Sequence, residues 1–273
     1  MKKISIIIPV HNEEKNIINF TETFYETTKD LLDKYEFRLV FCDDGSDDFT
    51  WDEIKSTKEK FDKYFHISGV KLLENYGKDY AILHGIKLSK TADAIITIDG
   101  DLQHPINLIP KMIENWDNGN YLIVHFLREN KNYSKFRIFL SYLFNKFFNF
   151  ITKFNLQVGI TDFKIVDKKI FKKFINSKKQ IFFYRGEISK FIERNEFITA
   201  DVNKRVLGKS SFNLKSLIVL SLNYITIYSY RPLYFISIFG FILFTLGLSA
   251  LLLSLIGIFK FTIIKVILIT NSI

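Results

Sequence analysis

The triplet Asp99-Gly100-Asp101 places two carboxylates directly after an apolar segment, residues 94–98. Residues i and i+2 of an extended chain point to the same side, so we expect both carboxylates to face one ligand. Two carboxylates this close repel each other unless a cation or a proton lies between them. Mg²⁺ or Mn²⁺, also held by phosphate oxygens, fits such a pair. Gly100 would let the backbone approach a bulky ligand.

A second acidic cluster, Asp43-Asp44-Gly45-Ser46, follows another apolar segment, residues 37–42. Acidic residues at strand ends accept hydrogen bonds from a ribose hydroxyl in dinucleotide folds, and a base N–H could be bound in the same way. The alternative interpretation is a turn in which an aspartate caps the next helix. The sequence contains neither GxGxxG nor the P-loop lysine motif, which disfavours nicotinamide enzymes and P-loop NTPases.

Strand and helix patterns alternate through the first 127 residues and would position these clusters. We expect strands at residues 4–10, 37–42, 66–72, 94–98 and 121–127, and helices at 13–34, 50–63, 79–89 and 106–117. This alternation predicts an α/β fold with a mostly parallel sheet and right-handed crossovers. Ligands of such sheets bind at the carboxyl ends of the strands. The polar clusters at 11–14, 43–48 and 99–104 should therefore lie together at that edge.

The 28 residues from 232 to 259 contain no charged side chain, and Arg231 and Lys260 flank them. A helix of ~20 apolar residues is enough to cross a bilayer core of ~30 Å. A buried core helix is the alternative, but such helices rarely run this long without a charge. We therefore predict a transmembrane helix.

Two further segments have the composition of helices that lie in a membrane interface. Residues 135–154 are rich in Phe and carry Lys135, Arg137, Lys146 and Lys153, and residues 213–230 lead into the apolar stretch. An ordinary core helix is the alternative for the first segment. The basic side chains would either anchor the protein at the membrane or be ordinary solvated charges.

The net charge of the 273-residue chain is +9, and its basic residues alternate with Phe and Ile beside the apolar stretch. This favours anionic lipids over nucleic acid as a partner. A single cysteine, Cys42, excludes an internal disulfide and agrees with a reducing compartment. The N-terminus has no signal-peptide pattern, so we expect a cytoplasmic catalytic domain at the cytoplasmic (inner) membrane. His66, His84 and His125 lack metal-ligand spacing and are interpreted as structural. A homo-oligomer remains open.

Four motifs, in this order along the chain, carry a resemblance to a known family: IIPVHNEE (7–14), DDGS (43–46), NYGK (75–78) and DGDLQHP (99–105). With Arg128, residues 161–164 (TDFK) and 205–211 (RVLGKSS), the chain resembles family-two glycosyltransferases with the GT-A fold, Rossmann-like and mostly parallel. Within that family it is most similar to the polyprenyl-phosphate glycosyltransferases, the group of dolichyl-phosphate mannose synthase and bacterial undecaprenyl-phosphate glucosyltransferases. The resemblance covers residues 3–232.

The resemblance implies a role for individual residues. Those expected to contact the nucleotide sugar are Pro9, His11, Glu13, Cys42, Asp44, Asp99, Gly100, Asp101, Arg128, Arg205 and Ser211. Asp99, Asp101 and Gln103 match the metal site, with Mg²⁺ or Mn²⁺ as cofactor. Arg128 and Arg205 match residues that hold phosphates and join the two aspartates in the expected catalytic set.

Three positions depart from the family pattern. Ser211 falls where many relatives carry Lys, His11 where Tyr is common, and Lys164 where Arg is usual. These differences affect contacts to the acceptor, although Lys209 could supply the missing charge.

The implied reaction is an inverting transfer of a sugar from a nucleotide-diphosphate sugar, a UDP-hexose, to polyprenyl phosphate, with undecaprenyl phosphate as the expected acceptor. A phosphate monoester with a second pKa of ~6 is mostly dianionic at neutral pH and needs no strong general base. Transfer to a growing polysaccharide is an alternative, disfavoured because Gln-X-X-Arg-Trp is absent. A non-catalytic membrane scaffold is a more distant one. The expected organisation is a nucleotide-sugar-binding core (1–133), an acceptor-side region (134–231), a transmembrane helix (232–259) and a tail (260–273).

Overall fold

The structure is a computed structural model that describes residues 1–119, 121–128, 135–157, 159–177, 182–191, 194–200 and 214–270. The chain divides into two compact units, Met1–Leu217 and Ile218–Ile273. The first unit contains the sheet and the acidic clusters, and the second consists mainly of one long apolar helix.

In the described part of the chain, seven strands form one sheet: β1 (Lys2–Val10), β2 (Tyr35–Asp43), β3 (His66–Lys71), β4 (Ala94–Thr97), β5 (Ile123–Arg128), β6 (Ile160–Asp167) and β7 (Asn195–Ala200). Their spatial order is β3-β2-β1-β4-β6-β5-β7. Pairing is parallel except at β6, which runs antiparallel to both β4 and β5. The predicted mostly parallel α/β sheet is confirmed, and the five predicted strands are present with ends shifted by up to two residues.

The helices and 3-10 turns are α1 (Ile17–Thr28), η1 (Lys29–Leu31), α2 (Thr50–Phe61), α3 (Lys78–Leu88), η2 (Ile106–Leu108), α4 (Ile109–Asn118), α5 (Lys135–Thr152), α6 (Lys168–Ile175), α7 (Tyr184–Ser189), α8 (Leu214–Tyr228) and α9 (Arg231–Thr270). The helix expected at 13–34 is shorter than predicted. Residues 13–16 instead form a loop in which the amide of Asn16 donates to the carbonyl of Glu13.

Alternating side chains of β1 pack into hydrophobic clusters on the two faces of the sheet. Ile4, Ile6 and Ile8 pack with residues of α1, α2 and α4, whereas Ile7 packs with residues of α3, α6 and α7. Strands covered by helices on both faces have no polar face, which explains the nearly continuous apolar runs in the sequence.

β6 and β7 come from the chain after residue 133, and the sequence patterns did not predict them as strands. β6 lies between β4 and β5, so the expected core (1–133) and acceptor-side region (134–231) share one sheet. The expected boundary at residue 133 falls inside the first compact unit. β6 escaped prediction because its polar residues, Thr161, Asp162 and Lys164, interrupt the apolar pattern.

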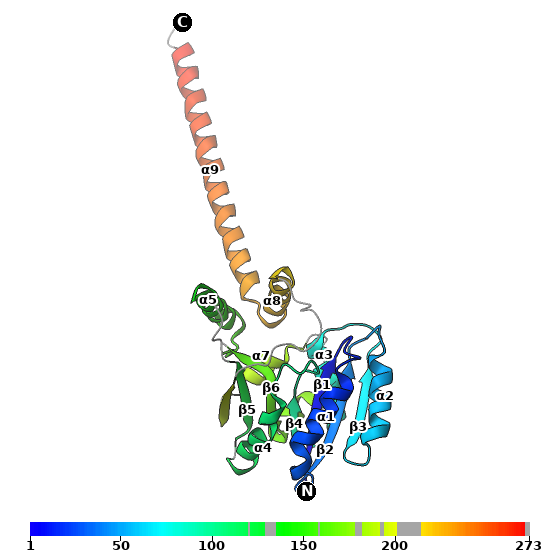
Figure 1. Cartoon of the computed structure of the whole chain (residues 1–273). Helices are drawn as coiled ribbons and strands as arrows, with labels where there is room; N and C mark the ends of the chain where they lie inside the picture. Colours follow the sequence, from blue (N-terminus) through cyan, green and yellow to red (C-terminus); the bar gives the residue numbers. More distant parts are fainter. Residues whose placement is uncertain are drawn as a thin grey trace. The chain divides into compact units, whose positions relative to one another are not determined.

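The order of the strands creates a switch point between β1 and β4. From β1 the chain builds outward through β2 and β3, and then returns to place β4 on the other side of β1. Ligands of doubly wound sheets bind in the crevice outside the carboxyl ends of the strands at such a point. In Figure 1 this edge lies opposite the chain's amino terminus, and α5 lies beyond it.

The second unit contains α9, whose residues Arg231–Lys265 form a helix long and apolar enough to cross a membrane by length and composition. A 35-residue helix rises ~50 Å, more than a bilayer core of ~30 Å requires. The predicted span at 232–259 is part of this helix. The helix continues to Thr270, so most of the expected tail (260–273) is helical as well.

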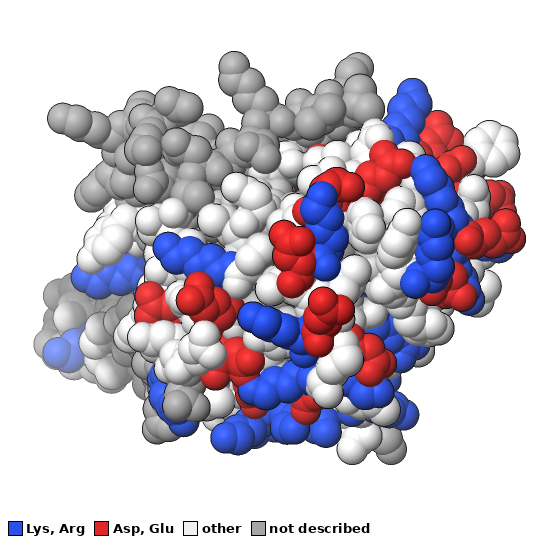
Figure 2. All heavy atoms as spheres, turned by 60° about the horizontal axis from the view of Figure 1, so that its bottom comes forward, with Lys and Arg blue, Asp and Glu red and all other residues white. Residues whose placement is uncertain are grey.

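The opposite edge of the sheet is covered by charges of both signs. Figure 2 shows this face, where basic and acidic side chains lie next to each other over the described residues. Ion pairs at this edge include Lys3 with Glu36 at 3.1 Å and Lys168 with Asp93 at 2.6 Å. The positive net charge is thus not gathered into a basic surface on the described residues of this face.

Close packing of α3 against the sheet leads to a stability prediction at Gly85. A Cβ there would overlap Cγ2 of Ile7 and lie 2.9 Å from the sulfur of Cys42. Overpacking of a core costs ~1–3 kcal/mol, so Gly85→Ala should lower the unfolding midpoint measured by tryptophan fluorescence in detergent. Gly247→Ala is the control, because a Cβ at Gly247 meets no atom within 4 Å. Equal midpoints for the two variants would contradict this account.

Candidate active site

The loops that follow β1 and β2 are joined by hydrogen bonds at the carboxyl edge. The amide of Asn12 donates to Ser46 Oγ at 2.9 Å, and the amide of Asp47 donates to Asn12 Oδ1 at 3.0 Å. The amide of Glu13 donates to Thr50 Oγ1 at 2.8 Å. Asn12 has a φ of 54°, which is uncommon for a residue other than glycine. The loops that carry residues 11–14 and 43–48 therefore form one braced unit.

The carboxylate of Asp44 is engaged by the loop that precedes α3. The carboxylate accepts hydrogen bonds from the backbone amides of Tyr76 at 2.8 Å and Gly77 at 2.9 Å. The backbone carbonyl oxygen of Asp44 lies 2.9 Å from Nδ1 of His11. Burial raises the pKa of Asp44 above its ordinary value, against the effect of the two amides. Asp43 accepts the amide of Ser46, as expected for a turn. Asp44 thus braces this loop, and its expected contact with the base stays a prediction.

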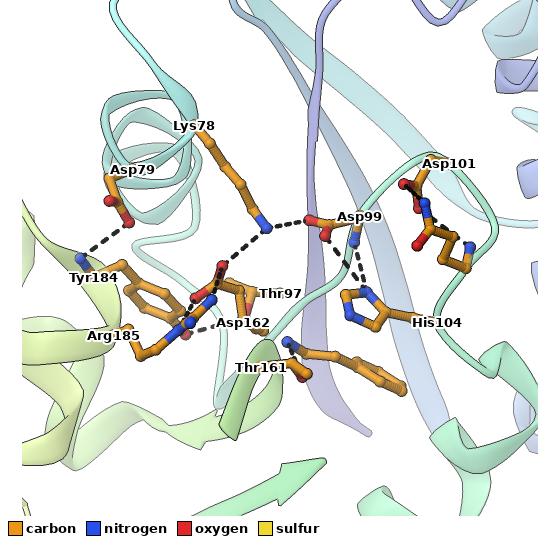
Figure 3. A network of polar contacts seen from close by, with 12 residues as sticks. Lys78, Asp79, Thr97, Asp99, Asp101, His104, Thr161, Asp162, Tyr184 and Arg185 are labelled. Carbon is orange, nitrogen blue, oxygen red and sulfur yellow. Dashed lines mark hydrogen bonds and ion pairs between the residues drawn. The ribbon is translucent and has the colours of Figure 1, made fainter. Parts of the chain in front are cut away.

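The triplet 99–101 forms a turn rather than a continuation of β4. The strand ends at Thr97, and Leu102 adopts a φ of 60°. As Figure 3 shows, Asp99 points toward Lys78 and His104. Asp101 instead accepts a hydrogen bond from the side chain of Gln103. The expectation of an extended triplet is therefore wrong. Bulky residues with positive φ cluster at functional sites, so this turn is itself a functional signal.

Gly100 is constrained by the protein itself. A Cβ at this position would lie 2.8 Å from Val10 Cγ1 on β1. The turn therefore packs directly on the neighbouring strand, which brings the ends of β1 and β4 together at the switch point. The expected approach of a bulky ligand at Gly100 stays a prediction.

Asp99 is part of a chain of charged groups that the sequence patterns did not reveal. Lys78 Nζ lies 2.5 Å from Asp99 Oδ1 and 2.9 Å from Asp162 Oδ2. Arg185 in turn donates to both oxygens of Asp162, from Nε at 3.2 Å and from a terminal nitrogen at 2.9 Å. Burial raises the pKa of Asp99, but Lys78 and His104 together keep that pKa below its ordinary value.

Asp162 is the most firmly held member of this chain. Burial works against its ionised form, yet Arg185 and Lys78 hold its pKa well below the ordinary range. Its backbone carbonyl also accepts a hydrogen bond from the hydroxyl of Thr97. Asp162 is consequently a carboxylate at neutral pH and a poor proton acceptor.

Asp101 and Gln103 interact within the same turn. The amide of Gln103 donates to Asp101 Oδ1 at 3.1 Å, and its side-chain nitrogen donates to Asp101 Oδ2 at 2.8 Å. The latter bond uses the nitrogen of the Gln103 side chain and not its oxygen. His104 packs its ring against Phe163 and Phe126, and burial lowers its pKa.

The other residues expected at the site include some whose side chains the structure describes and some whose side chains it does not. Pro9 and Cys42 are paired across β1 and β2, and the thiol of Cys42 is buried in the hydrophobic cluster of α3, with its pKa raised. Any contact of Cys42 with a nucleotide would therefore involve its backbone. The backbone of Arg128 ends β5 at the same edge as the turn, and its side chain lies outside the described residues. Arg205, Lys209 and Ser211 also lie outside them.

Three residues of the site, Lys78, Asp162 and Arg185, were not among those expected from the sequence. Lys78 and Asp162 stood in motifs that carried the family resemblance, so a signal existed, but nothing in the sequence indicated that they pair. Arg185 stood in no motif. His125 was interpreted from the sequence as a structural residue. It is buried and stacks on Phe197, and burial lowers its pKa to about 2, which fits that role.

With this geometry in view, comparison with known proteins identifies the family. The model of glycosyl transferase family 2 matches residues 5–175. The chain belongs to glycosyltransferase family 2. It is 30% identical over 233 residues to the bactoprenol glucosyl transferase of Shigella phage SfX, covering 85% of this chain and 74% of that protein. It is also 30% identical over 242 residues to YkcC, an uncharacterized glycosyltransferase of Bacillus subtilis, covering 88% and 72%.

Among solved structures, a similar fold is that of glucosyl-3-phosphoglycerate synthase from Mycobacterium tuberculosis, in complex with Mn²⁺, UDP and phosphoglyceric acid. The TM-score is 0.55 at 15% identity, and the match covers 82% of this chain and 76% of that one. The family-two and GT-A expectations are thereby confirmed.

One buried lysine of this family-two enzyme has an unusual environment. Lys164 on β6 is 0% exposed, and its Nζ has no hydrogen-bond partner among the described residues. The nitrogen lies 5.0 Å from the centre of the Tyr184 ring. Burial lowers the pKa of Lys164 to about 7, although the charge of Asp162 opposes that shift. A buried amine of this kind destabilises the fold whenever it is protonated.

Lys164 should therefore shape the pH dependence of stability. Between pH 7 and 10 the unfolded chain, with a lysine pKa of ~10.4, binds more protons at this site than the folded chain. Its contribution to stability rises with pH across that window. Lys164→Met should remove this rise and raise the unfolding midpoint at pH 7. Thermal unfolding at pH 7, 8 and 9 measures how the midpoint changes with pH, and Lys90→Met at the surface is the control. An unchanged slope in Lys164→Met would show that the amine is solvated.

Proposed function

We propose that this enzyme transfers a hexose from a UDP-sugar to polyprenyl phosphate, with inversion at the anomeric carbon, at the cytoplasmic face of a membrane. The observation that carries the proposal is the turn Asp99-Gly100-Asp101 at the switch point of a family-two sheet. A turn there presents carboxylates to the diphosphate of a bound nucleotide sugar. Asp99 and Asp101 are the groups to which we assign that role.

Support for the acceptor comes from the relative of Shigella phage SfX, whose name states that it transfers glucose to bactoprenol. The chain covers 74% of that protein, and the family match includes the turn and the strands around it. Support for uridine is weaker, since it comes from the fold neighbour crystallised with UDP. Undecaprenyl phosphate is accordingly the first acceptor to test.

The residues of the turn fit a hard divalent cation. Asp99 and Asp101 offer carboxylate oxygens and Gln103 an amide oxygen, the ligand types that Mg²⁺ and Mn²⁺ prefer. Among the described residues no group of three or more His, Cys, Asp or Glu side chains forms a complete site. Phosphate oxygens of the donor would supply the other ligands. A bound cation would neutralise charge on the departing diphosphate.

The described charges also fit a reaction without a protein base. An oxygen of the acceptor phosphate would bond to the anomeric carbon as the bond from that carbon to the diphosphate oxygen breaks. The attacking dianion has no proton to lose. Asp162 has a pKa far too low to accept one, because Arg185 and Lys78 stabilise its charge. The protein's task is therefore to position the two substrates and to balance their charge.

The outer face of α5 supports a membrane-bound acceptor. Phe147 and Phe150 are 57% and 61% exposed, whereas Phe148 on the inner face is 3% exposed. A helix with an exposed aromatic face, and with Lys146 nearby, suits the interface of a bilayer. Together with the apolar α9, it would keep the enzyme where a polyprenyl phosphate must be. This raises the effective concentration of the acceptor.

The direct test is glycolipid synthesis. Purified full-length protein is incubated with undecaprenyl phosphate, Mn²⁺ or Mg²⁺ and a set of nucleotide sugars, and products are identified by mass spectrometry. We expect a monoglycosylated polyprenyl phosphate from a UDP-hexose. No product from any donor, with a folded protein, would refute the proposed function.

Asp101→Asn tests the role of the turn. Loss of one carboxylate from a cation site removes several kcal/mol of charge stabilisation, so the turnover number should fall at least ~100-fold. Asp93→Asn is the matched control, because Asp93 pairs with Lys168 and lies outside the turn. Near wild-type turnover in Asp101→Asn would overturn the assignment of this carboxylate.

The double variant Phe147→Ser, Phe150→Ser tests the interfacial role of α5. Each exposed aromatic ring contributes ~1–3 kcal/mol when buried in an apolar medium. The KM for undecaprenyl phosphate in liposomes should rise several-fold, whereas the KM for a short, water-soluble prenyl phosphate should not. Leu88→Ser, on α3, serves as the control. An equal rise for both acceptors would indicate a local packing defect and not a membrane contact.

A further inference from the structure

Lys78 is the one described residue of the charged chain that contacts both Asp99 and Asp162. It begins α3, and its ammonium lies 2.5 Å from an oxygen of Asp99 and 2.9 Å from an oxygen of Asp162. Figure 3 shows the nitrogen between the two carboxylates. Lys78 and Arg185 together balance the charges of Asp99 and Asp162, so these four groups are neutral as a set.

The two carboxylates differ in how firmly they are held. Asp162 is fixed by two nitrogens of Arg185, and its backbone carbonyl accepts a hydrogen bond from Thr97. Asp99 has the Lys78 ammonium as its close charged partner, since His104 Nδ1 lies farther away at 3.7 Å. A lysine side chain has four flexible carbons, so Lys78 can stay on Asp162 while Asp99 turns to another cation.

We propose that Lys78 and the divalent cation compete for Asp99. In the enzyme without donor, Lys78 acts as the internal counter-ion of Asp99 and keeps cation affinity low. Donor binding brings in the negative charge of a diphosphate, which rebalances the site. Asp99 then binds the cation and Asp162 retains Lys78. Lys78 is thus a positioning residue that makes the cation bind together with the nucleotide. This inference rests on the proposed role of Asp99.

Competition predicts that removing the ammonium strengthens cation binding. Mn²⁺ binding to the full-length protein in detergent is measured from the electron paramagnetic resonance signal of free Mn²⁺. Without nucleotide, Lys78→Met should bind Mn²⁺ ~3- to 10-fold more tightly than the wild type, the range expected for a partly exposed ion pair. With UDP present, the difference should shrink, because Asp99 has then already been released. Lys78→Gln provides the same test if Lys78→Met does not fold.

Two controls separate direct competition from other effects. Lys168→Met removes a lysine from a similar pair with Asp93 and should leave Mn²⁺ affinity unchanged. Arg185→Gln also removes one positive charge, but from a residue whose side chain donates to Asp162. It should tighten Mn²⁺ binding much less than Lys78→Met does. An equal effect of the two variants would reveal a general field and overturn the proposal.

The remaining outcomes distinguish this inference from the proposed function. Unchanged or weaker Mn²⁺ binding in Lys78→Met and Lys78→Gln would mean that Lys78 holds Asp99 ready for the cation, which overturns the competition alone. In that case Asp101→Asn should still weaken Mn²⁺ binding, which keeps the turn as the cation site. If the wild type binds no Mn²⁺ even with UDP, both the inference and the cation assignment fail.

Discussion

The antiparallel pairing of β6 with β4 is the constraint on which the site depends. The register pairs Thr97, the last residue of β4, with Lys164, and the hydroxyl of Thr97 donates to the backbone carbonyl of Asp162, which brings Asp162 to the end of β4. Asp162 therefore meets Lys78 and Asp99 although 62 or more residues of chain separate it from either. With a parallel strand in that place, residue 162 would lie at the far edge of the sheet, among the ion pairs of the opposite face.

Placing four charged groups at a sheet edge has an energetic cost that the pairing must offset. Partly buried ion pairs gain from mutual attraction but lose hydration, and removing one partner leaves an uncompensated charge. Here each group has a partner of opposite sign, and Asp162 and Lys78 each have two. Lys164, two residues farther along β6, has no such hydrogen-bonded partner among the described residues, and its lowered pKa shows the cost of burying an amine there. The charges around Asp162 are therefore balanced, whereas the buried amine of Lys164 lowers the stability of the fold when it is protonated.

The acidic turn and the aromatic helix α5 belong to the same unit of the fold and suit the two halves of one reaction. In the proposed reaction, carboxylates whose counter-ion can be exchanged would suit a donor that brings its own charge. An exposed aromatic face suits an acceptor that cannot leave a bilayer. The link between the two is the carboxyl edge of the sheet, where the described loops are braced by hydrogen bonds and where β5 ends at Arg128.

The sequence alone determined the elements whose apolar pattern is long and regular. The apolar runs of β1, β2 and β4 follow from burial on both faces of the sheet. The uncharged stretch of α9 is long and apolar enough to cross a bilayer by length and composition. The order of the motifs also identified the family and drew attention to residues 99–101, although these residues were expected to be extended and not to form a turn.

Only the tertiary structure decided what the charges in that turn contact. β6 was hidden because Thr161, Asp162 and Lys164 break its apolar pattern, and its direction cannot be read from local propensity. The pairing of Lys78 with Asp99, and the fixing of Asp162 by Arg185, bring together residues from separate elements. Such contacts arise from strand order and register, which depend on the whole packed sheet and not on any local run of residues.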